Sequence, residues 1–387
     1  MKRASRRNRQ WNGAPTVAEF CSAMESIAPT GLAQSWDNVG LLVGDKTAPS
    51  RRVMLAIDLT RAVLEEARRF HADVLLAYHP PIFKPISSLC TPGAGMDALV
   101  FECIRHGIAV FSPHTALDAA DGGTNDVLAS LCGATQTEPL VYVETPGRSE
   151  CKLVVFVPED HVERVSAAMF AAGAGRIGNY ECCSFRSTGV GTFFGSESTM
   201  PAVGKKGRLE TVDEVRLESI VSSASLPDVI ASLRSTHPYD EPAFDVYPLK
   251  PLPVRGIGRF GRMDRPVTMR TLAQRLQRAT RVANVQAVGP GRQQIDRVVV
   301  VAGAAGSLPF RVSLTSRDAV ITGEIRHHDA LAFQRIGCCA IALGHWASER
   351  PVLGTVATQL REHLRGITIR LSRRDADPFS AVTRRTP

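Results

Sequence analysis

The sequence predicts an α/β fold in which two related halves surround a small inserted α+β domain. In the first and last thirds of the chain, short apolar runs alternate with segments whose apolar residues recur every three or four positions. Such alternation is typical of strands joined by crossover helices, which build a parallel sheet. A glycine-rich stretch at 173–207 separates the two regions and predicts a change of architecture there.

The two halves are expected to hold similar β-α-β units. Val17, Phe20, Met24 and Ile27 share one helical face, which predicts a helix at 16–27. Further along the first half, strands are predicted at 53–59, 74–77 and 108–111, and helices at 61–71, 96–106 and 125–131. The second half repeats the order, with strands at 298–301, 319–321 and 338–343, and helices at 308–314, 329–336 and 352–364.

The middle of the chain has a different pattern. Strands are predicted at 152–157, 215–221 and 243–249, and helices at 160–172 and 226–236. This order, over about 100 residues, predicts a ferredoxin-like domain. Pro146 and Gly147 mark its start, and the proline-rich residues 248–253 form its exit. We therefore expect a basic tail at 1–12, a first half at 13–146, an inserted domain at 147–250 and a second half at 251–387.

The composition is that of a globular protein. Hydrophobic residues make up 44% and charged residues 22% of the 387 residues, which is ordinary for soluble proteins. No apolar run approaches the roughly 20 residues that a membrane-spanning helix needs. The nine cysteines show no CxxC spacing, so we expect reduced thiols in an intracellular protein, not a cysteine metal site or a disulfide framework.

The net charge of +8 is concentrated at the N-terminus. Five basic residues lie in the first nine positions, and the chain without them has a net charge of +3. The tail is interpreted first as a disordered, solvated arm, with a mitochondrial transit peptide and a nucleic-acid-binding arm as alternatives. We therefore expect a cytoplasmic protein with no membrane partner. A mitochondrial location, or a nucleic-acid or transcription-factor partner, depends on the function of the tail.

Polar residues that can bind metal ions follow four of the predicted strands. They are Tyr78 and His79 after 74–77, His114 and Asp118 after 108–111, Glu324, His327 and His328 after 319–321, and His345 and Glu349 after 338–343. In open α/β sheets, ligands bind beyond the carboxyl ends of the strands. Histidine and carboxylate side chains are the ligands of catalytic zinc and other transition metals. Together these positions favour one shared metal site.

Each position also has a purely structural interpretation. His345 and Glu349 share one helical face at i and i+4, but they could also form an exposed polar turn. Asp118, four residues after His114, could cap the following helix. His79 could be a core histidine with satisfied ring nitrogens. Only the combination of strand ends from both halves favours the ligand interpretation.

Three further features are less specific. Glu324 is expected to orient a ligand imidazole, and His327 and His328 either line a pocket or lie solvated on the first turn of a helix. Trp36 is either a pocket wall or a core residue. The sequence HPYDEP at 237–242 holds a second His/Asp/Glu set, but its two prolines favour a rigid loop.

Several segments resemble the Nif-three-like family, also described as GTP cyclohydrolase 1 type 2-like dinuclear-metal proteins. The segments are SWDNVGLLVGD (35–45), AYHPPIFKP (77–85), SPHTALDAADGGTND (112–126), ITGEIRHHDA (321–330), GHWASE (344–349) and SRRDADPF (372–379). The resemblance spans about 17–379. GAGRIGNYECCSFRSTGVGTF (173–193) and HPYDEPAFDVYPL (237–249) resemble the extra domain of longer members, which is similar to PII-type signalling folds.

The resemblance implies two divalent metal ions, such as Zn, Fe, Mn or Co, in a cleft. Carried over position by position, the ligands are Tyr78, His79, Asp118, His345 and Glu349. Tyr78 stands where the family has a histidine. Because a neutral phenol is a poorer ligand than an imidazole, the second ion is expected to be bound more weakly or to recruit His114. The family also forms toroidal hexamers, so a homo-oligomer is expected.

The activity that the resemblance implies is metal-dependent hydrolysis of a small, nucleotide-like substrate, as the cyclohydrolase name indicates. In this interpretation Glu349 bridges two ions, and Glu324, His328 or His114 moves protons. The alternative is a non-enzymatic, metal-dependent regulatory or interaction protein, in which the inserted domain acts as a sensor or gate.

Overall fold

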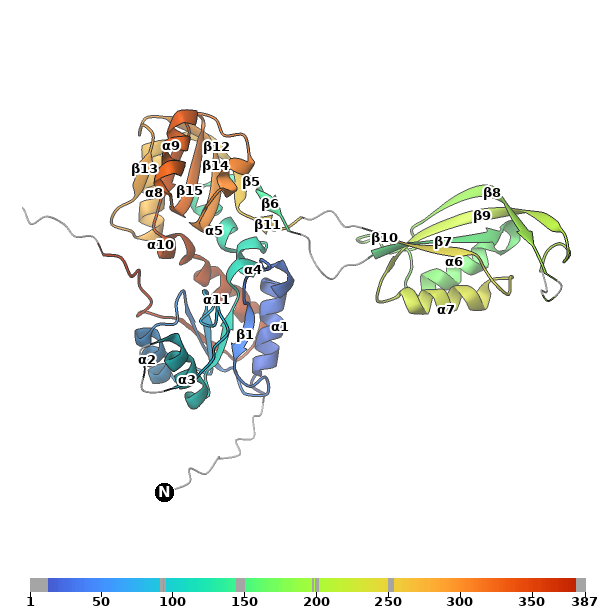
Figure 1. The fold of residues 1–387 in the computed structure, drawn as a ribbon, viewed down its shortest axis with the longest axis horizontal. Helices are drawn as coiled ribbons and strands as arrows, with labels where there is room; N and C mark the ends of the chain where they lie inside the picture. The colour runs from blue at the N-terminus through green and yellow to red at the C-terminus, as the bar shows by residue number, and fades with distance from the viewer. Residues whose placement is uncertain are drawn as a thin grey trace, which may run out of the picture. The chain divides into compact units, whose positions relative to one another are not determined.

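The computed structural model describes residues 13–90, 93, 95–143, 150–196, 198, 202–249 and 254–380. The chain forms two compact units, one made of Met1–Glu144 with Pro253–Pro387 and the other of Thr145–Leu252 (Figure 1). The first unit is therefore discontinuous in sequence. The basic tail at 1–12 and the two predicted domain borders lie outside the described residues, so their interpretation stays a prediction.

The first sheet of the first unit has five strands in the order β1-β4-β3-β2-β17. These are β1 (Gly40–Val43), β2 (Arg52–Ala56), β3 (Val74–Ala77), β4 (Ala109–Ser112) and β17 (Thr368–Leu371). β17, β2, β3 and β4 run parallel, and β1 is an antiparallel edge strand. All residues of β3 and β4 are buried, as expected for parallel strands covered on both faces.

Helices cover both faces of this sheet. α2 (Arg61–Phe70) and α3 (Met96–His106) pack on one face, and α1 (Val17–Ile27) and α11 (Val352–His363) pack on the other. Because successive strand residues point to opposite faces, Met54 joins the core beside α2, and Leu55 joins the core beside α1.

The second sheet has six strands in the order β13-β16-β15-β14-β12-β5. These are β5 (Ala134–Glu138), β12 (Arg259–Thr268), β13 (Gln286–Val288), β14 (Gln294–Ala304), β15 (Asp318–Glu324) and β16 (Cys339–Ala342). β14, β15 and β16 are parallel, and the outer strands are antiparallel. α5 (Thr124–Cys132) and α8 (Met269–Thr280) pack on one face, and α9 (His327–Ile336) packs on the other.

Short elements complete the first unit. β6 (Val141–Tyr142) pairs with β11 (Gly256–Ile257). Two helices of one to two turns, α4 (His114–Ala119) and α10 (His345–Glu349), follow β4 and β16 and carry several of the predicted ligands. All nine cysteines of the chain are free. Within the described ranges, no helix has the length and apolar character needed to cross a membrane.

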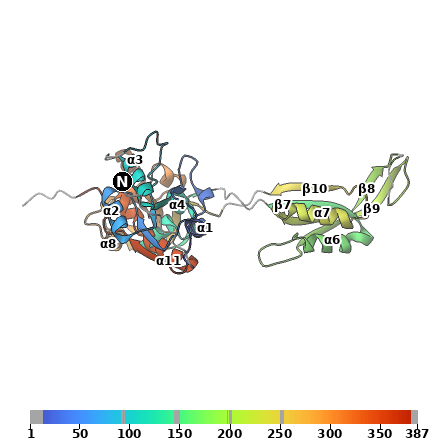
Figure 2. The same ribbon diagram turned by 90° about the horizontal axis from the view of Figure 1, so that it is seen from below.

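The second unit is a four-stranded antiparallel sheet in the order β10-β7-β9-β8. Its elements follow the chain as β7 (Glu150–Pro158), α6 (Val162–Ala171), β8 (Ser184–Phe194), β9 (Leu209–Ser222), α7 (Leu226–Thr236) and β10 (Phe244–Leu249). α6 and α7 lie side by side on one face of the sheet (Figure 1, Figure 2). This β-α-β-β-α-β order is the ferredoxin-like order.

The mixed α/β class is confirmed, but several elements differ from the prediction. The glycine-rich stretch contains β8, which pairs with β9 along its whole length. A Cβ on Gly191 would meet the carboxylate of Glu214, which is the end of a flexible side chain and would have to move aside. The predicted helix at 308–314 is only a short 3-10 turn, Leu308–Arg311. β15 extends to Glu324, so Thr322 and Gly323 are strand residues and do not follow the strand.

Candidate metal centre

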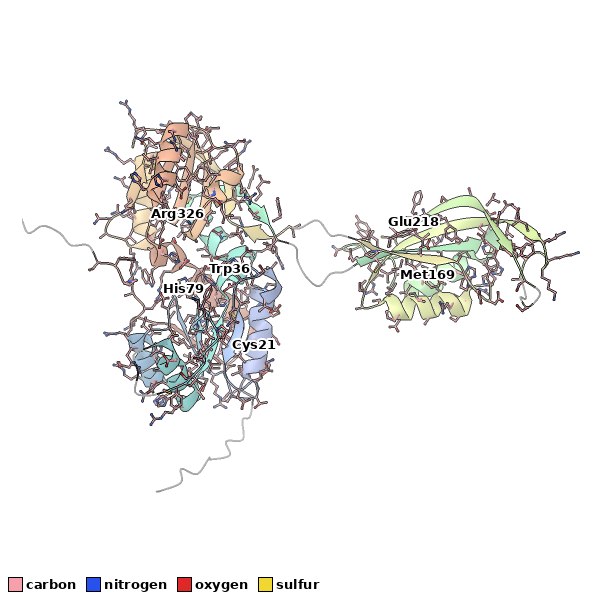
Figure 3. All side chains as sticks on the ribbon, viewed as in Figure 1. Cys21, Trp36, His79, Met169, Glu218 and Arg326 are labelled. Carbon is pink, nitrogen blue, oxygen red and sulfur yellow. The ribbon has the colours of Figure 1, made fainter. Side chains whose placement is uncertain are left out.

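Three potential ligands from the two sheets meet in the first unit. His79 follows β3 of the first sheet, and His345 and Glu349 lie on α10, which follows β16 of the second sheet. Among the described residues, these three are the one group of metal-binding side chains whose donor atoms all lie within 4.8 Å of one another. We call them the candidate triad. Figure 3 shows His79 in the region between the two sheets.

The short helix α10 presents two members of the triad on one face. His345 and Glu349 are four residues apart, so their side chains project in the same direction. The helix begins after Gly344, whose φ of +94° is a conformation that favours glycine. Glu349 is only 4% exposed, so its carboxylate has lost most of its hydration.

The Nδ1 atom of each histidine in the triad is held by a carboxylate. His79 Nδ1 lies 2.9 Å from Asp58 Oδ1, and His345 Nδ1 lies 2.9 Å from Glu324 Oε1. A carboxylate accepts from the Nδ1 proton and so fixes both the tautomer and the ring orientation, as is usual for metal-binding histidines. The Nε2 atoms of both rings are left for the centre of the site.

Both Nε2 atoms face Glu349. His79 Nε2 lies 3.3 Å from Glu349 Oε2, and His345 Nε2 lies 3.2 Å from Oε1. With the proton on Nδ1, each Nε2 presents a lone pair, which cannot bond to a carboxylate oxygen. The arrangement therefore requires positive charge between the donors. It is supplied by a proton on each ring or by a metal ion.

The residues present fit a metal ion. Glu349 Oε2 is buried and has no hydrogen-bond partner among the described residues, although His79 Nε2 lies 3.3 Å away. A buried carboxylate oxygen without a partner costs free energy unless a cation binds it. A tetrahedral ion with bonds of about 2.1 Å holds its ligand atoms roughly 3.4 Å apart, which agrees with the observed separations.

In the ion-free protein, protons supply this charge. Burial lowers the pKa of His79, but the hydrogen bond to Asp58 and the charge of Glu349 outweigh it and raise the pKa to about 10. Contact with Glu349 raises the pKa of His345 to about 9, against the effect of burial. Burial favours protonated Glu349, yet its contacts with His345 and His79 hold its pKa below the usual value.

Gly303, at the end of β14, leaves the space between these donors open. Its φ is +66°, and a Cβ at this position would lie 2.5 Å from Glu349 Oε1 and 3.3 Å from His345 Nε2. The Gly303 amide donates to the Ser348 hydroxyl at 2.9 Å, which fixes the strand end against α10. Any other residue at 303 would crowd both ligands.

Tyr78 and Asp118 form a separate pair beside the triad. The Tyr78 hydroxyl donates to Asp118 Oδ1 at 2.5 Å and also contacts Thr124. Burial and the nearby charges of Asp118 and Glu349 raise the pKa of Tyr78 well above its ordinary value, so the phenol stays neutral. Burial also raises the pKa of Asp118 to about 6. Neither residue belongs to the triad.

His114 lies next to the triad in a strained backbone conformation. Its φ is +27°, which costs a non-glycine residue roughly 1–3 kcal/mol. Asp37 stabilises this conformation, because it contacts the His114 Nδ1 at 2.8 Å and accepts hydrogen bonds from the amide and hydroxyl of Thr115. The His114 ring lies 5.3 Å from the His79 ring, centroid to centroid. Asp118 lies within α4 and does not cap the next helix, which Gly123 precedes.

The remaining predicted site residues are exposed. Glu324 contacts His345, and its side chain is 56% exposed. His327 and His328 lie on the exposed first turn of α9 and contact each other, with ring centroids 5.6 Å apart. Glu324 therefore reaches the triad through its contact with His345. For His328 the structure gives only the contact with His327.

Asp375, near the C-terminus, joins the two parts of the site. Its carboxylate accepts from the Ile57 amide and from the Trp346 indole, both at 3.0 Å, and pairs with Arg350 at 2.8 Å. Ile57 precedes Asp58, and Trp346 follows His345. One buried carboxylate thus contacts both the segment of Asp58, which holds the His79 ring, and the segment of His345.

Sequence reasoning missed Asp37, Asp58, Gly303 and Asp375 as parts of the site. Asp37 lies in the segment SWDNVGLLVGD, but it follows none of the predicted strands. Asp58 and Gly303 each follow the apolar part of a strand, as the predicted ligands do. That position was the available signal for both residues.

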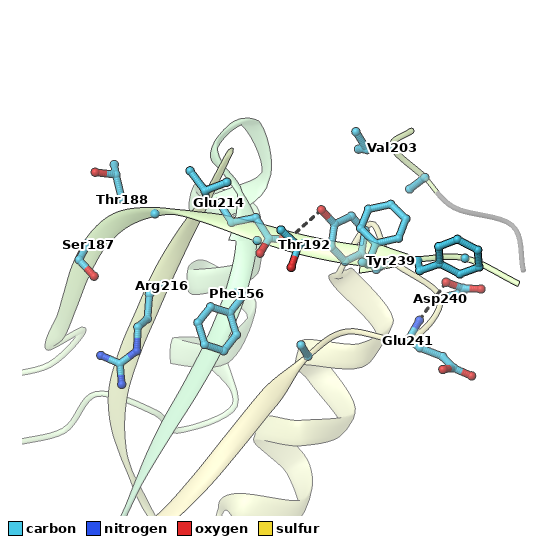
Figure 4. Close-up of a pocket in the computed structure, with 18 residues that line it drawn as sticks. Phe156, Ser187, Thr188, Thr192, Val203, Glu214, Arg216, Tyr239, Asp240 and Glu241 are labelled. Carbon is cyan, nitrogen blue, oxygen red and sulfur yellow. Dashed lines mark hydrogen bonds between the residues drawn. The ribbon is translucent and has the colours of Figure 1, made fainter. Parts of the chain in front are cut away.

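The second unit holds a cavity of about 530 Å³ that is separate from the triad. Phe156, Glu214, Tyr239, Asp240 and Glu241 are among its lining residues (Figure 4). Several of these are carboxylates, but they do not converge with histidines on one point among the described residues. The triad is therefore the candidate metal centre among the described residues.

Two curated proteins with similar sequences carry the same description. A protein of Halalkalibacterium halodurans is 37% identical over 318 residues, which cover 82% of this chain and 84% of that protein. One from Mycobacterium tuberculosis is 36% identical over 370 residues, covering 94% and 96% of the two chains. Both are described as GTP cyclohydrolase 1 type 2 homologs.

Solved structures share the fold along nearly the whole chain. A Bacillus cereus protein related to NIF3 is 33% identical, with a TM-score of 0.73, and covers 96% of this chain and 100% of its own. A Staphylococcus aureus protein is 25% identical, with a TM-score of 0.78, and covers 95% and 99%. A family model described as Duf34/NIF3 (NGG1p interacting factor 3) matches residues 15–378. The chain therefore belongs to the Duf34/NIF3 family.

Proposed function

We propose that this protein binds a divalent transition-metal ion at His79, His345 and Glu349 and uses it for hydrolysis. The observation that carries the proposal is the buried Glu349 carboxylate, which has one oxygen without a hydrogen-bond partner and two imidazole Nε2 atoms facing it. Two nitrogen donors and one carboxylate leave a coordination position for water or substrate, as in catalytic zinc sites. Zn, Fe, Mn and Co all suit this donor set.

In this proposal a second ion is bound more weakly than the first. Its donors in this proposal are Glu349, Asp118 and His114, with Tyr78 in the place of a family histidine. Tyr78 stays a neutral phenol that donates to Asp118, so it competes for the carboxylate and does not bind an ion. We therefore propose one well-bound ion and one weak position, and Glu349 would contribute a carboxylate oxygen to each.

The proposed chemistry is hydrolysis of a nucleotide-like small molecule. A bound ion of this kind lowers the pKa of a water ligand from 15.7 towards about 7. Glu324 holds the Nδ1 side of His345 and is exposed, so it can accept a proton and release it to solvent. When the weak metal position is empty, His114 can move protons at the opposite side, beside His79. His328 stays a proposed proton carrier on α9. The substrate class is supported by the cyclohydrolase description of the relatives.

A non-enzymatic regulatory protein is the alternative, and one observation favours it. The second unit has a cavity of about 530 Å³ lined by aromatic and acidic side chains. Such a cavity suits a small regulatory ligand. In this alternative the second unit, which we propose to be PII-like, senses a metabolite while the triad binds metal. The toroidal hexamer also remains part of the proposal, and the mass of the full chain in solution tests it.

Metal content per chain tests the main proposal. We expect about one tightly bound ion in the wild-type protein, loss of it in Glu349→Ala, and a second ion in Tyr78→His, where an imidazole replaces the phenol. Glu241→Ala is the matched control, because it removes an exposed carboxylate of the second unit. Metal content that is unchanged in Glu349→Ala contradicts the proposal. Metal without turnover of any nucleotide favours the regulatory alternative.

A further inference from the structure

Two exposed aromatic side chains lie together beside the candidate triad. Trp36 is 59% exposed and Phe83 is 49% exposed. Their ring centroids are 6.0 Å apart, and the ring planes are inclined by 58°. Trp36 is therefore not a core residue. Clustered large apolar side chains on a surface mark binding sites, whereas single ones are common and need no explanation. We call this pair the Trp36–Phe83 platform.

A series of neighbouring rings connects the platform to the triad. The Trp36 ring lies 6.1 Å from the His114 ring, which lies 5.3 Å from the His79 ring. His345 follows at 5.5 Å from His79. Figure 3 labels Trp36 and His79 close together in the same part of the first unit. A molecule on the platform therefore lies next to the position proposed for the metal ion.

The platform is held by the same residues that position the site. Asp37, which follows Trp36, binds the ring of His114 and the hydroxyl of Thr115. The Asn38 side chain donates to the carbonyl of Ile82, the residue before Phe83, at 2.5 Å. These hydrogen bonds connect the loop that carries Trp36 to the loop that carries Phe83 and to α4. The exposed rings are thus pre-organised, which lowers the entropy cost of binding a ligand.

We propose that the Trp36–Phe83 platform binds the planar heteroaromatic ring of the substrate, a ring of nucleobase size. Indole and phenyl rings stack on any planar ring with a π-face, independently of its hydrogen-bonding groups. Trp36 offers one large face, and the tilted Phe83 contacts the ligand from the side. This inference deepens the proposed function and rests on it, because it names the substrate class of the same centre.

Calorimetric titration of the full-length protein, with and without added Zn²⁺, tests the platform. The two probes are guanosine 5′-monophosphate and ribose 5-phosphate, which carries the same sugar and phosphate but no ring. We expect the nucleotide to bind the wild-type protein at least about tenfold more tightly than ribose 5-phosphate, because a stacked base contributes of this order. Metal content is measured on the same samples.

The variants separate stacking from other effects. Trp36→Leu and Phe83→Leu are each expected to weaken nucleotide binding by roughly tenfold or more, with metal content and unfolding temperature unchanged. Trp36→Phe keeps an aromatic face and is expected to retain most of the affinity. Phe185→Leu is the control, because Phe185 is 64% exposed and belongs to the second unit. It is expected to change nothing.

Three outcomes overturn the inference. Equal affinity of the wild-type protein for both probes would show that the ring is not recognised. Unchanged nucleotide affinity in both leucine variants would show that the platform does not bind it. A change of oligomeric mass in these variants, without a change of affinity, assigns the surface to a second copy of the chain. Ring-dependent binding by a protein that holds no metal contradicts the proposed function alone and leaves the platform standing.

Discussion

His79 in the first unit and His237 in the second both lie beside carboxylates, yet the structure uses their ring nitrogens in opposite ways. His237 donates from Nε2 to the Phe156 carbonyl at 3.0 Å, and its Nδ1 accepts from the Tyr239 amide at 3.1 Å. Burial lowers the pKa of His237 and keeps the ring neutral. Both nitrogens are occupied by backbone groups, so this histidine braces the loop and cannot bind a metal ion.

Only one ring nitrogen of His79 has a hydrogen-bond partner of this fixed kind, and that partner is a side chain. Asp58 holds its Nδ1, and its Nε2 faces a buried carboxylate oxygen that has no hydrogen-bond partner. The acids near His237 are also exposed, whereas Glu349 is buried. A His/Asp/Glu set becomes a candidate metal site when ring nitrogens remain free and the carboxylate has lost its water. Composition alone does not separate the two sets.

Among changes that test the contrast between His79 and His237, Gly303→Ala is expected to have the largest effect on metal affinity. An alanine at φ +66° costs about 1–2 kcal/mol of backbone strain, and its Cβ would displace the Glu349 carboxylate. We expect metal affinity to fall by more than about a hundredfold, measured by competition with a metal-binding dye. Gly354→Ala is the control, because Gly354 lies in α11 and a Cβ added there would have no atom within 4 Å. Equal affinity in the two variants would show that the ion binds elsewhere.

The pH dependence of metal binding is expected to be the next largest effect. Without an ion, His79 and His345 hold protons up to pKa values of about 10 and 9. A metal ion must displace both protons, so its affinity falls as the pH is lowered, by up to about a hundredfold per pH unit between pH 8 and 6.

Titration calorimetry at pH 7 in two buffers of different ionisation enthalpy counts the released protons directly. Two protons per ion agree with the triad. No proton release means that the imidazoles are neutral before the ion arrives, and this result contradicts the contrast with His237.

A smaller effect is expected from Asp58→Asn. The amide can still contact the ring of His79 but no longer polarises it, and such a change costs about 10–100-fold in metal affinity. Asp240→Asn, the matched change beside His237, is expected to leave metal affinity unchanged. Equilibrium dialysis of both variants provides the comparison. An equal loss in the two variants would remove the distinction between the two histidines.

The parts of the site that follow from local spacing could be predicted from the sequence. His345 and Glu349 share a face because they are four residues apart on a helix, and His79 follows a strand of continuous apolar residues. Parallel strands place their carboxyl ends at one edge, so these positions were expected to approach one another.

The partners of these residues could not be predicted in the same way. Asp58 precedes His79 by 21 residues and Asp37 precedes His114 by 77, and only the register of the sheets brings them together. β8 was missed because its glycines weaken every local strand signal, while its pairing with β9 depends on a neighbour that the sequence pattern does not identify. The role of Gly303 depends on side chains that lie more than 40 positions away.

The contacts of Asp375 determine when the candidate metal centre can form during synthesis of the chain. All elements of the second unit lie within Thr145–Leu252, so its internal contacts can form once that stretch has left the ribosome. The first sheet instead waits for β17, which pairs with β2, and Asp375 must still reach Ile57 and Trp346. Contacts between such distant residues form slowly. The contacts that hold the proposed metal centre can therefore form only after the whole second unit has been synthesised.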